Sequence, residues 1–202
     1  MMSGKKKQYH HGNLSSDLVT QAIKLLEQEG ISALSLRRVA KEAGVSQAAP
    51  YSHFKDKQAL LTSVANEGYS RFGKRMLLEA QSGKEEDYLI GLGRGYIFFA
   101  MENPGLFHLM FGGELSKLID VNAINDEYGS SYQMLVDAID KHPLDRFSKQ
   151  PKPLLDVAFS WSLVHGIANL LQAERFTPEK YGYKDVEPFV DDLLRRYLGS
   201  AE

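Results

Sequence analysis

The stretch from Ser35 to Leu60 constrains the fold of this chain more than any other part of it. Ser35 can cap a helix, Leu36–Ala43, and Gly44 can end that helix in a tight turn. A second, short helix is predicted to start at Ser46 and to end near residue 53. Two helices joined by a tight turn form the helix-turn-helix arrangement, so the sequence predicts this motif here.

Small and aromatic side chains in this stretch fit the motif. Ala40 and Ala43 allow the two helices to cross closely, and Gly44 can adopt the positive φ that the turn requires. The second helix is too short to be stable alone, so Tyr51 and Phe54 are expected to anchor it to its neighbours. The alternative is an ordinary helical hairpin of a bundle, in which the small residues serve packing only.

The rest of the chain also shows helical periodicity, and no segment shows the sustained alternation of a strand. The predicted fold class is therefore all-α, with an N-terminal three-helix helix-turn-helix domain and a C-terminal helical bundle. Asn13 and Asp56 are suitable caps for the first and fourth helices. The segment 85–101 is expected to be amphipathic, and the segment 115–140 is expected to be interrupted near Gly129. About nine helices are expected, over residues 14–29, 36–43, 46–53, 57–81, 85–101, 106–111, 115–140, 154–174 and 186–198.

Charge is distributed unevenly along the chain. Residues 1–57 contain nine Lys and Arg against five Asp and Glu, although the whole chain carries a formal net charge of −2. A basic N-terminal quarter on an acidic body indicates a polyanion-binding head. Residues 1–12 are expected to form a basic flexible arm. Its lysines, Lys5–Lys7, either contact the minor groove or the phosphates of DNA or remain in solvent.

Composition and missing motifs exclude several classes of protein. There is no cysteine, so the chain can form neither a disulfide nor a thiolate metal site, which fits a cytoplasmic location. The N-terminus is positive but lacks the apolar run of a signal peptide. The sequence has no phosphate-binding loop, dinucleotide fingerprint, nucleophile elbow or zinc-protease motif, and its six histidines do not form a ligand-spaced set. We therefore expect no enzymatic activity, no metal and no cofactor.

The helix-turn-helix segment resembles the DNA-binding head of the TetR (tetracycline-repressor-like) family over roughly residues 13–62. The matching positions, in order, are Ser35-Leu36, Val39-Ala40, Ala43–Ser46, Tyr51–Phe54, Lys57 and Leu60-Leu61. Ala48 departs from the glycine that many relatives have at this position, which affects the expected base preference and not the fold. The opening Tyr9–Leu14 and the pattern Trp161, His165-Gly166 resemble a branch of the family with a Trp-His-Gly C-terminal domain.

This resemblance implies a dimeric, ligand-responsive transcription regulator, a repressor, that binds a palindromic operator in double-stranded DNA. It implies a helix-turn-helix domain over residues 13–57 and a ligand-sensing and dimerisation domain over residues 58–202. The alternative hypothesis is a sequence-blind architectural DNA-binding protein without an effector. Such a protein would not need the long uncharged helix predicted near the C-terminus.

The second helix of the motif is expected to lie in the major groove and to read base edges. Gln47 is the best candidate for base reading, because its amide can form two hydrogen bonds with adenine, and Ala48 and Ala49 can touch thymine methyl groups. Tyr51 is either a phosphate contact or a structural residue. The full set of predicted DNA contacts is Ser35, Arg37, Arg38, Ser46, Gln47, Ala48, Ala49, Tyr51, His53 and Lys57.

The predicted helix 154–174 is the best candidate for a dimer contact. No charged side chain occurs between Asp156 and Glu174, and the polar residues Ser162, His165, Asn169 and Gln172 form one narrow stripe. A helix that is apolar nearly all round must be buried on nearly all sides. A membrane span is disfavoured because the run is short of about 20 residues and contains these polar groups. The predicted contacts, shared with the last helix, are Phe159, Leu163, Ile167, Leu170, Leu171, Val190 and Leu194.

Aromatic and methionine side chains between residues 85 and 111 suggest an effector pocket, which the family resemblance places there. The alternative is an ordinary core. His165 either orients a ligand or is a core histidine bonded to a backbone carbonyl. Because helix 154–174 has no Arg or Lys, the expected small-molecule effector is apolar or weakly polar. The predicted pocket residues are Phe98, Met101, Phe107, Met110, Phe111, Trp161 and His165.

Overall fold

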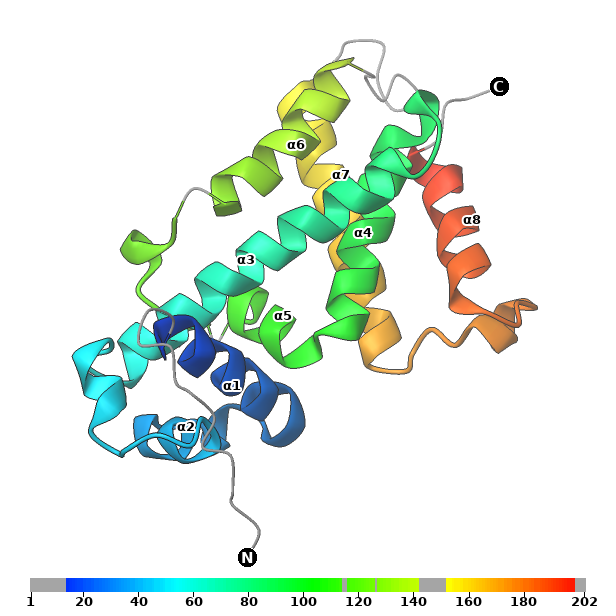
Figure 1. Cartoon of the computed structure of the whole chain (residues 1–202). Coiled ribbons are helices and arrows are strands. Elements are labelled where there is room, and N and C mark those ends of the chain that lie inside the picture. Colours follow the sequence, from blue (N-terminus) through cyan, green and yellow to red (C-terminus); the bar gives the residue numbers. More distant parts are fainter. Residues whose placement is uncertain (1–13, 114–115, 126, 142–151, 199–202) are drawn as a thin grey trace, which may run out of the picture.

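A computed structural model describes residues 14–113, 116–125, 127–141 and 152–198 (Figure 1). All regular secondary structure in these ranges is helical, so the predicted all-α class is confirmed. The predicted basic arm at residues 1–12 and the Asn13 cap lie outside the described residues. The α-helices are α1 Leu14–Glu29, α2 Leu36–Glu42, α3 Lys57–Gln81, α4 Tyr88–Glu102, α5 Pro104–Phe111, α6 Glu127–Lys141, α7 Pro153–Gln172 and α8 Val186–Leu198.

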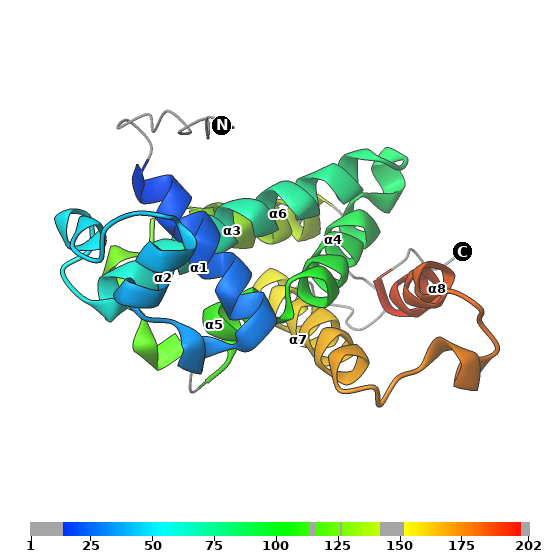
Figure 2. The same ribbon diagram turned by 60° about the horizontal axis from the view of Figure 1, so that its bottom comes forward.

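Helices α1 and α2 pack beside the first turns of α3 and form a small head at one end of the molecule (Figures 1 and 2). Leu18 and Leu26 of α1, Val39 of α2 and Leu60 of α3 are buried in its core. The body, built from α4 to α8, lies along the remainder of α3. Since α3 is a single 25-residue helix that runs through both parts, head and body share a rigid element.

Helix α4 occupies the centre of the body, between α3, α7 and α8. The sequence predicted an amphipathic helix here, but α4 is buried on nearly all sides. Gly91 and Gly95 explain the close packing: a Cβ added to either would lie 2.5 Å from a Cα of α3, that of Ala80 or that of Met76. Two glycines one helical turn apart thus let the backbones of α3 and α4 touch.

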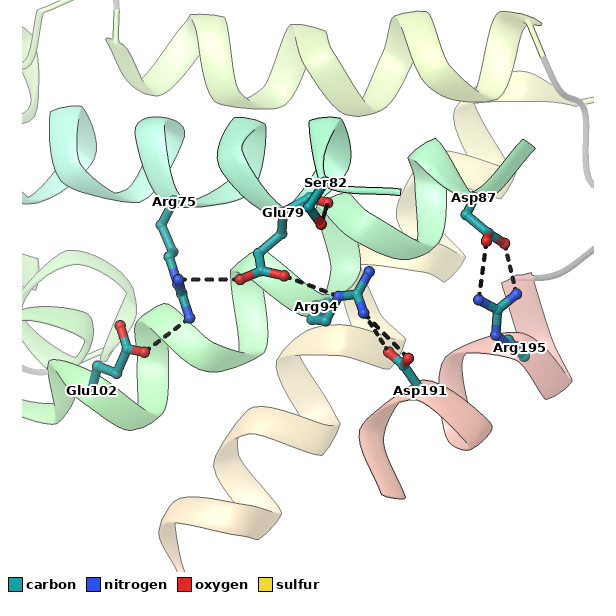
Figure 3. Close-up of polar contacts among 8 residues, drawn as sticks. All are labelled: Arg75, Glu79, Ser82, Asp87, Arg94, Glu102, Asp191 and Arg195. Atoms are coloured by element: carbon teal, nitrogen blue, oxygen red, sulfur yellow. Dashed lines mark hydrogen bonds and ion pairs between the residues drawn. The ribbon is translucent and has the colours of Figure 1, made fainter. Parts of the chain in front are cut away.

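Helix α8 is attached to the body by an apolar face and by ion pairs (Figure 3). Phe189, Val190 and Leu194 are buried. Arg94 of α4 pairs with Asp191 of α8 at 3.2 Å and with Glu79 of α3 at 3.1 Å.

A second bridge joins the far end of α8 to the segment that precedes α4. Arg195 contacts both carboxylate oxygens of Asp87, at 2.6 and 3.1 Å, and this hydrogen bonding holds the pKa of Asp87 below its usual value. The middle and the last turn of α8 are therefore both tied to the body of the same subunit.

The segment between α5 and α6 differs from its prediction. Two 3₁₀ turns, Ser116–Leu118 and Val121–Ala123, occupy the first part of the predicted helix 115–140. Gly129 lies inside α6 rather than at a break. Polar side chains of α3 hold the segment in place: Thr62 accepts a hydrogen bond from the backbone of Asp120, and Asn66 bonds the backbone on either side of Ile124. These side chains compete successfully with helix formation for the backbone groups of the segment.

Candidate nucleic-acid interface and buried cavity

The start of the helix-turn-helix follows the sequence prediction closely. The Ser35 hydroxyl accepts a hydrogen bond from the backbone N–H of Arg38 at 3.1 Å and so caps α2. Gly44 has a φ of 69°, a left-handed conformation that glycine adopts without strain. The N–H of Val45 then bonds the carbonyl of Ala40 at 3.0 Å and closes the turn. The predicted cap and the predicted positive φ are both confirmed.

The second helix of the motif is shorter than predicted. Instead of an α-helix from Ser46, the chain forms two turns and one short 3₁₀ helix, Ala49–Ser52. Pro50 supplies the physical reason, because it lacks the N–H that would bond the carbonyl of Ser46 in an α-helix. That carbonyl accepts the N–H of Ala49 at 3.0 Å instead. Ser46 therefore takes part in the turn through its backbone carbonyl, and the predicted cap by its side chain is not observed.

Pro50 and Phe54 anchor this recognition segment, Ser46–His53, to the head. Both side chains are buried. Tyr51, which the sequence suggested as the second anchor, is 52% exposed to solvent. The importance of Pro50 was missed because a proline in a turn usually marks a change of chain direction rather than a core contact. Tyr51 is thus available to a ligand of the head.

The predicted DNA contacts mostly lie on the surface of the head. Arg37, Gln47, Ala48 and His53 are exposed, and Ala49 is half-buried. The other exposed positions of the predicted set are Ser35, Ser46, Tyr51 and Lys57. These positions run from the start of α2 to the start of α3, and Figure 1 shows that this stretch of the backbone lies within the head.

Two of the predicted cationic contacts are engaged within the chain. Arg38 forms ion pairs with Glu29 at 2.8 Å and with Glu42 at 2.9 Å, so its charge is already balanced. The Lys57 ammonium donates a hydrogen bond to the carbonyl of Ile31 at 3.1 Å, while its own helix is capped by Asp56. A phosphate could replace the carbonyl partner of Lys57 more easily than it could replace two carboxylates around Arg38.

The body encloses a cavity of about 50 Å³. Its described lining carries no charged side chain and comes from five helices, α3 to α7. The lining residues are Phe72, Met76, Leu89, Leu92, Gly93, Tyr96, Phe111, Ser131, Tyr132, Leu135, Ser160, Trp161 and Val164.

Only some of the predicted pocket residues line this cavity. Phe111 and Trp161 line it and also line a second, more open pocket, together with Ser162 and His165. The others lie elsewhere: Phe98 packs under the guanidinium of Arg75, and Met101 is partly exposed on the outside of α4. Phe107 and Met110 are buried in the core but do not reach the cavity. The prediction missed the walls from α3 and α6, because it drew only on helices 85–111 and 154–174.

Tyr96 connects α4 to α7 through a directional chain of hydrogen bonds. The Trp161 indole can only donate, and it donates to the Tyr96 hydroxyl at 3.2 Å. The Tyr96 hydroxyl can then donate its own hydrogen to Nδ1 of His165, which lies 2.8 Å away. Donation from Tyr96 corresponds to the neutral form of His165 with its hydrogen on Nε2. Burial, with a smaller contribution from His108, lowers the pKa of His165 and favours that form. His165 is therefore bonded to a side chain and not to a backbone carbonyl.

Helix α5 joins the cavity to the head. The Glu27 carboxylate of α1 accepts hydrogen bonds from the backbone N–H groups of Gly105 and Leu106, at 2.9 and 2.8 Å. These groups have no acceptor within the first turn of α5, where the helix dipole also favours a negative charge. At the other end of α5, Phe111 forms part of the cavity wall. Glu27 of the head thus holds α5, the helix that carries the cavity-lining residue Phe111.

Helix α7 buries only one of its sides within the subunit. Val157, Val164 and Ile167 face the core, whereas Leu155 is 61% and Phe159 39% exposed. The outer stripe continues at four-residue and three-residue steps to Leu170. Of the predicted dimer contacts, Phe159 and Leu170 are exposed and Leu163 is half-buried. Ile167, Leu171, Val190 and Leu194 are buried within the subunit, because the apolar face of α8 and the inner face of α7 complete the core of the body itself.

The length of α7 does not exclude a membrane span. With 20 residues and a mean hydropathy of 1.4 in its most apolar window, it is long and apolar enough to cross a bilayer. The helix is weak evidence for a span, because a buried core helix has the same length and composition, and its uncharged run, 157–173, is shorter than the helix itself. The packing of α7 against α4 and α6 accounts for part of its apolar surface, and the exposed stripe accounts for the rest.

Comparisons with known protein families match both parts of the chain. Residues 18–64 match the model of bacterial regulatory proteins of the tetR family, and residues 89–197 match the Tetracyclin repressor-like C-terminal domain. These matches name no Trp-His-Gly branch, which stays a prediction.

Individual relatives extend over nearly the whole chain. The HTH-type transcriptional regulator AcrR of Shigella flexneri is 42% identical over 192 residues, which cover 88% of this chain and 86% of AcrR. A Rhodococcus sp. RHA1 protein of unknown function has a similar structure, with a TM-score of 0.75, 26% identity, and coverage of 95% of this chain and 94% of that one. The fatty acid degradation regulator FadR of Bacillus halodurans shares the fold, with a TM-score of 0.68, 17% identity, and coverage of 96% and 99%.

Proposed function

The chain belongs to the TetR family of helix-turn-helix transcription regulators, and from that premise we propose that it is a dimeric repressor whose affinity for a palindromic operator is controlled by a small molecule. The observation that carries the proposal is the exposed recognition segment, Ser46–His53, held on the head by buried Pro50 and Phe54. This arrangement holds the segment rigidly on the head, so that its side chains can enter a groove of DNA.

Within the head, different side chains have different roles. Gln47 reads a base edge, because its exposed amide can both donate and accept in the major groove. Ala48 and Ala49 contact thymine methyl groups. Ser35, Arg37, Ser46, Tyr51, His53 and Lys57 contact phosphates and set the register of the head on DNA. Arg38 holds α2 against α1 through its two ion pairs and contributes less to DNA contact than Arg37 does.

Dimerisation uses the outer stripe of α7, defined by Leu155, Phe159, Leu163 and Leu170. A two-fold axis beside this stripe would bring the same residues of two subunits together, as an isologous interface requires. The stripe is uncharged and apolar, which is the composition expected at the centre of such an interface. Burial of α7 on both sides would also explain why the helix lacks charge on its outer face, and it favours a soluble cytoplasmic dimer over a membrane protein.

The effector binds in the cavity lined by helices α3 to α7. Its entry favours a different arrangement of the cavity walls, and two of those walls lead to the head: α3 directly, and α5 through Glu27. An effector that binds one arrangement more tightly shifts the equilibrium toward that arrangement, and the difference in affinity sets the size of the shift. The favoured arrangement has a different spacing of the two heads. Heads that no longer fit successive major grooves release the operator.

Selection of genomic fragments tests this function. Random fragments of the source genome are incubated with the protein, and bound fragments are separated and sequenced. We expect enrichment of fragments that share an inverted repeat. Equal retention of all fragments would contradict the proposal and favour the alternative, a sequence-blind architectural protein without an effector.

Two variants then separate base reading from phosphate contact on the enriched fragment. Gln47→Ala should relax the preference at one base position of each half-site and leave the salt dependence unchanged. Lys57→Ala should weaken binding to all sequences alike and reduce the slope of log K against log[salt] by about one for each phosphate that the lysine neutralises. An unchanged slope for Lys57→Ala would show that this lysine keeps its bond to Ile31 and does not contact phosphate.

A further inference from the structure

Ser160 stands out among the residues around the cavity. Its side chain comes from α7, is 2% exposed, and its hydroxyl makes no hydrogen bond with any residue that the structure describes. Buried hydroxyl groups in folded proteins are nearly always paired, with protein, with water or with a ligand. Ser160 also lines the cavity, so the missing partner has a place to bind.

The hydroxyl group of Tyr96 already has hydrogen-bond partners within the protein. The Tyr96 hydroxyl, which also lines the cavity, accepts from Trp161 and lies 2.8 Å from His165. Arg94 follows the lining residue Gly93 in α4, but its guanidinium is directed away to Asp191 and Glu79 (Figure 3). A charged ligand would therefore find no opposite charge among the described lining residues. The remaining hydroxyl groups of the lining belong to Ser131 and Tyr132 of α6, and Ser131 has an interaction partner of its own. The buried wall from α7 offers the Ser160 hydroxyl.

The size of the cavity limits its occupant further. A volume of about 50 Å³ is smaller than the roughly 150 Å³ of an engineered apolar cavity that binds benzene. A ring-sized molecule must therefore displace part of the wall. Trp161 is the part most suited to move, because it lines both the cavity and the second pocket and packs edge-on against the partly exposed Tyr132.

We propose that the cavity binds an uncharged, ring-sized apolar molecule that carries a single hydroxyl or carbonyl group, and that Ser160 binds this group. The ligand displaces the indole of Trp161 toward the second pocket and packs against the rings of Phe72 and Phe111, which contact each other in the cavity wall. This inference rests on the proposed effector response, and it names the chemistry of the effector. Ser160 determines which apolar rings are accepted.

Phenol, toluene and benzoate test the proposal as probes. Phenol and toluene have nearly the same shape, but phenol carries a hydroxyl group where toluene carries a methyl group. Benzoate carries a charged carboxylate at this position. Titration calorimetry on the full-length protein at pH 7 measures the Kd of each. We expect phenol and toluene to bind and benzoate not to bind. In Ser160→Ala, the ratio of the toluene Kd to the phenol Kd should fall by about tenfold, the effect of one buried hydrogen bond.

Ser63→Ala provides a matched control. Ser63 lies on α3 outside the cavity lining, and its hydroxyl bonds the carbonyl of Ala59 in its own helix. This variant should keep the wild-type ratio of the two Kd values. An unchanged ratio in Ser160→Ala would overturn the role of Ser160. Binding of benzoate as tight as that of phenol, or no binding of either neutral ring, would overturn the proposed ligand class.

A separate measurement keeps the two proposals distinguishable. The affinity for the enriched DNA fragment is measured for Ser160→Ala without any probe, and it should equal that of the wild type. If phenol binds through Ser160 but leaves DNA affinity unchanged, the ligand site stands and the effector response fails. If DNA affinity is lost in Ser160→Ala without a ligand, the residue supports the fold and the ligand proposal fails.

Discussion

His165 lies where the side chains of α4, α5 and α7 meet. The rings of Tyr96, Phe107 and Phe111 surround it at centroid distances of 6.2, 5.5 and 6.3 Å. Burial lowers the pKa of His165 from its ordinary value of 6.5, and the nearby His108 adds to this effect. Protonation would place a hydrogen on Nδ1 and would reverse the hydrogen bond from Tyr96. Burial therefore favours the neutral imidazole over the charged one.

The sign of the resulting pH dependence follows from linkage. Below pH 6.5 the unfolded chain binds a proton at this histidine more readily than the folded protein does, so the free energy of unfolding should fall as the pH falls. His165→Phe removes this titration and keeps an aromatic ring in place. Urea unfolding at about pH 7.5 and at about pH 5.5 should show a smaller loss of stability for the variant than for the wild type. Equal losses in both proteins would contradict the assignment.

Sequence patterns that depend on near neighbours predicted the roles of some residues correctly and of others incorrectly. Ser35, Gly44 and Asp56 were predicted correctly, since a cap or a positive φ depends on neighbours a few residues away. Tyr51 was assigned wrongly as an anchor, and Ser160 received no role. Their surroundings come from distant parts of the chain, so only the tertiary structure could show that one is exposed and the other is buried beside a cavity.

At the scale of elements, α5 depends on a contact with α1. Glu27→Gln keeps an acceptor at the α5 N-terminus but removes its charge, so both hydrogen bonds become weaker. We expect this variant to lower the free energy of unfolding by about 1–2 kcal/mol. Glu67→Gln is the matched control, because it removes an exposed ion pair with Arg71 in one helix, worth about 0.3–0.5 kcal/mol. Equal losses in the two variants, measured by urea unfolding, would argue against a special role of Glu27.

Helix α7 provides the corresponding prediction for dimerisation. Phe159→Asp places a charge in the middle of the outer stripe without disturbing the buried face of the helix, so it should yield a 22.7 kDa monomer. Leu78→Asp is the matched control, because Leu78 is also apolar and is more exposed but lies on α3. Sedimentation velocity should find a dimer for the wild type and for Leu78→Asp. A dimer for Phe159→Asp would move the interface away from this stripe.

The sequence predicted the existence of most helices but not how they pack. Periodicity detected α1, α3, α7 and α8 with nearly correct bounds. It did not reveal that α4 is central, since the role of Gly91 and Gly95 depends on the approach of α3. It also placed Val190 and Leu194 at a dimer contact, because an apolar face alone does not say whether it meets its own subunit or another one.

For the whole molecule, the continuity of α3 is the main mechanical feature. Leu60 and Leu61 of this helix are buried in the head, and Phe72 and Met76, roughly three to four turns further on, line the cavity. In the proposed effector response, a ligand that moves the cavity end of α3 would tilt the head with it. Glu27 adds a second connection through α5, so a change in the cavity wall reaches the head by two routes.

The central claim is that two subunits, joined through α7, present two heads to one inverted repeat. Sedimentation equilibrium of the protein with the enriched DNA fragment tests it most directly. The mass of the complex should equal one DNA fragment plus two chains of 22.7 kDa, and a fragment with one half-site replaced should bind far more weakly. A complex with a single chain, or continued addition of chains along the DNA without saturation at two, would contradict the account.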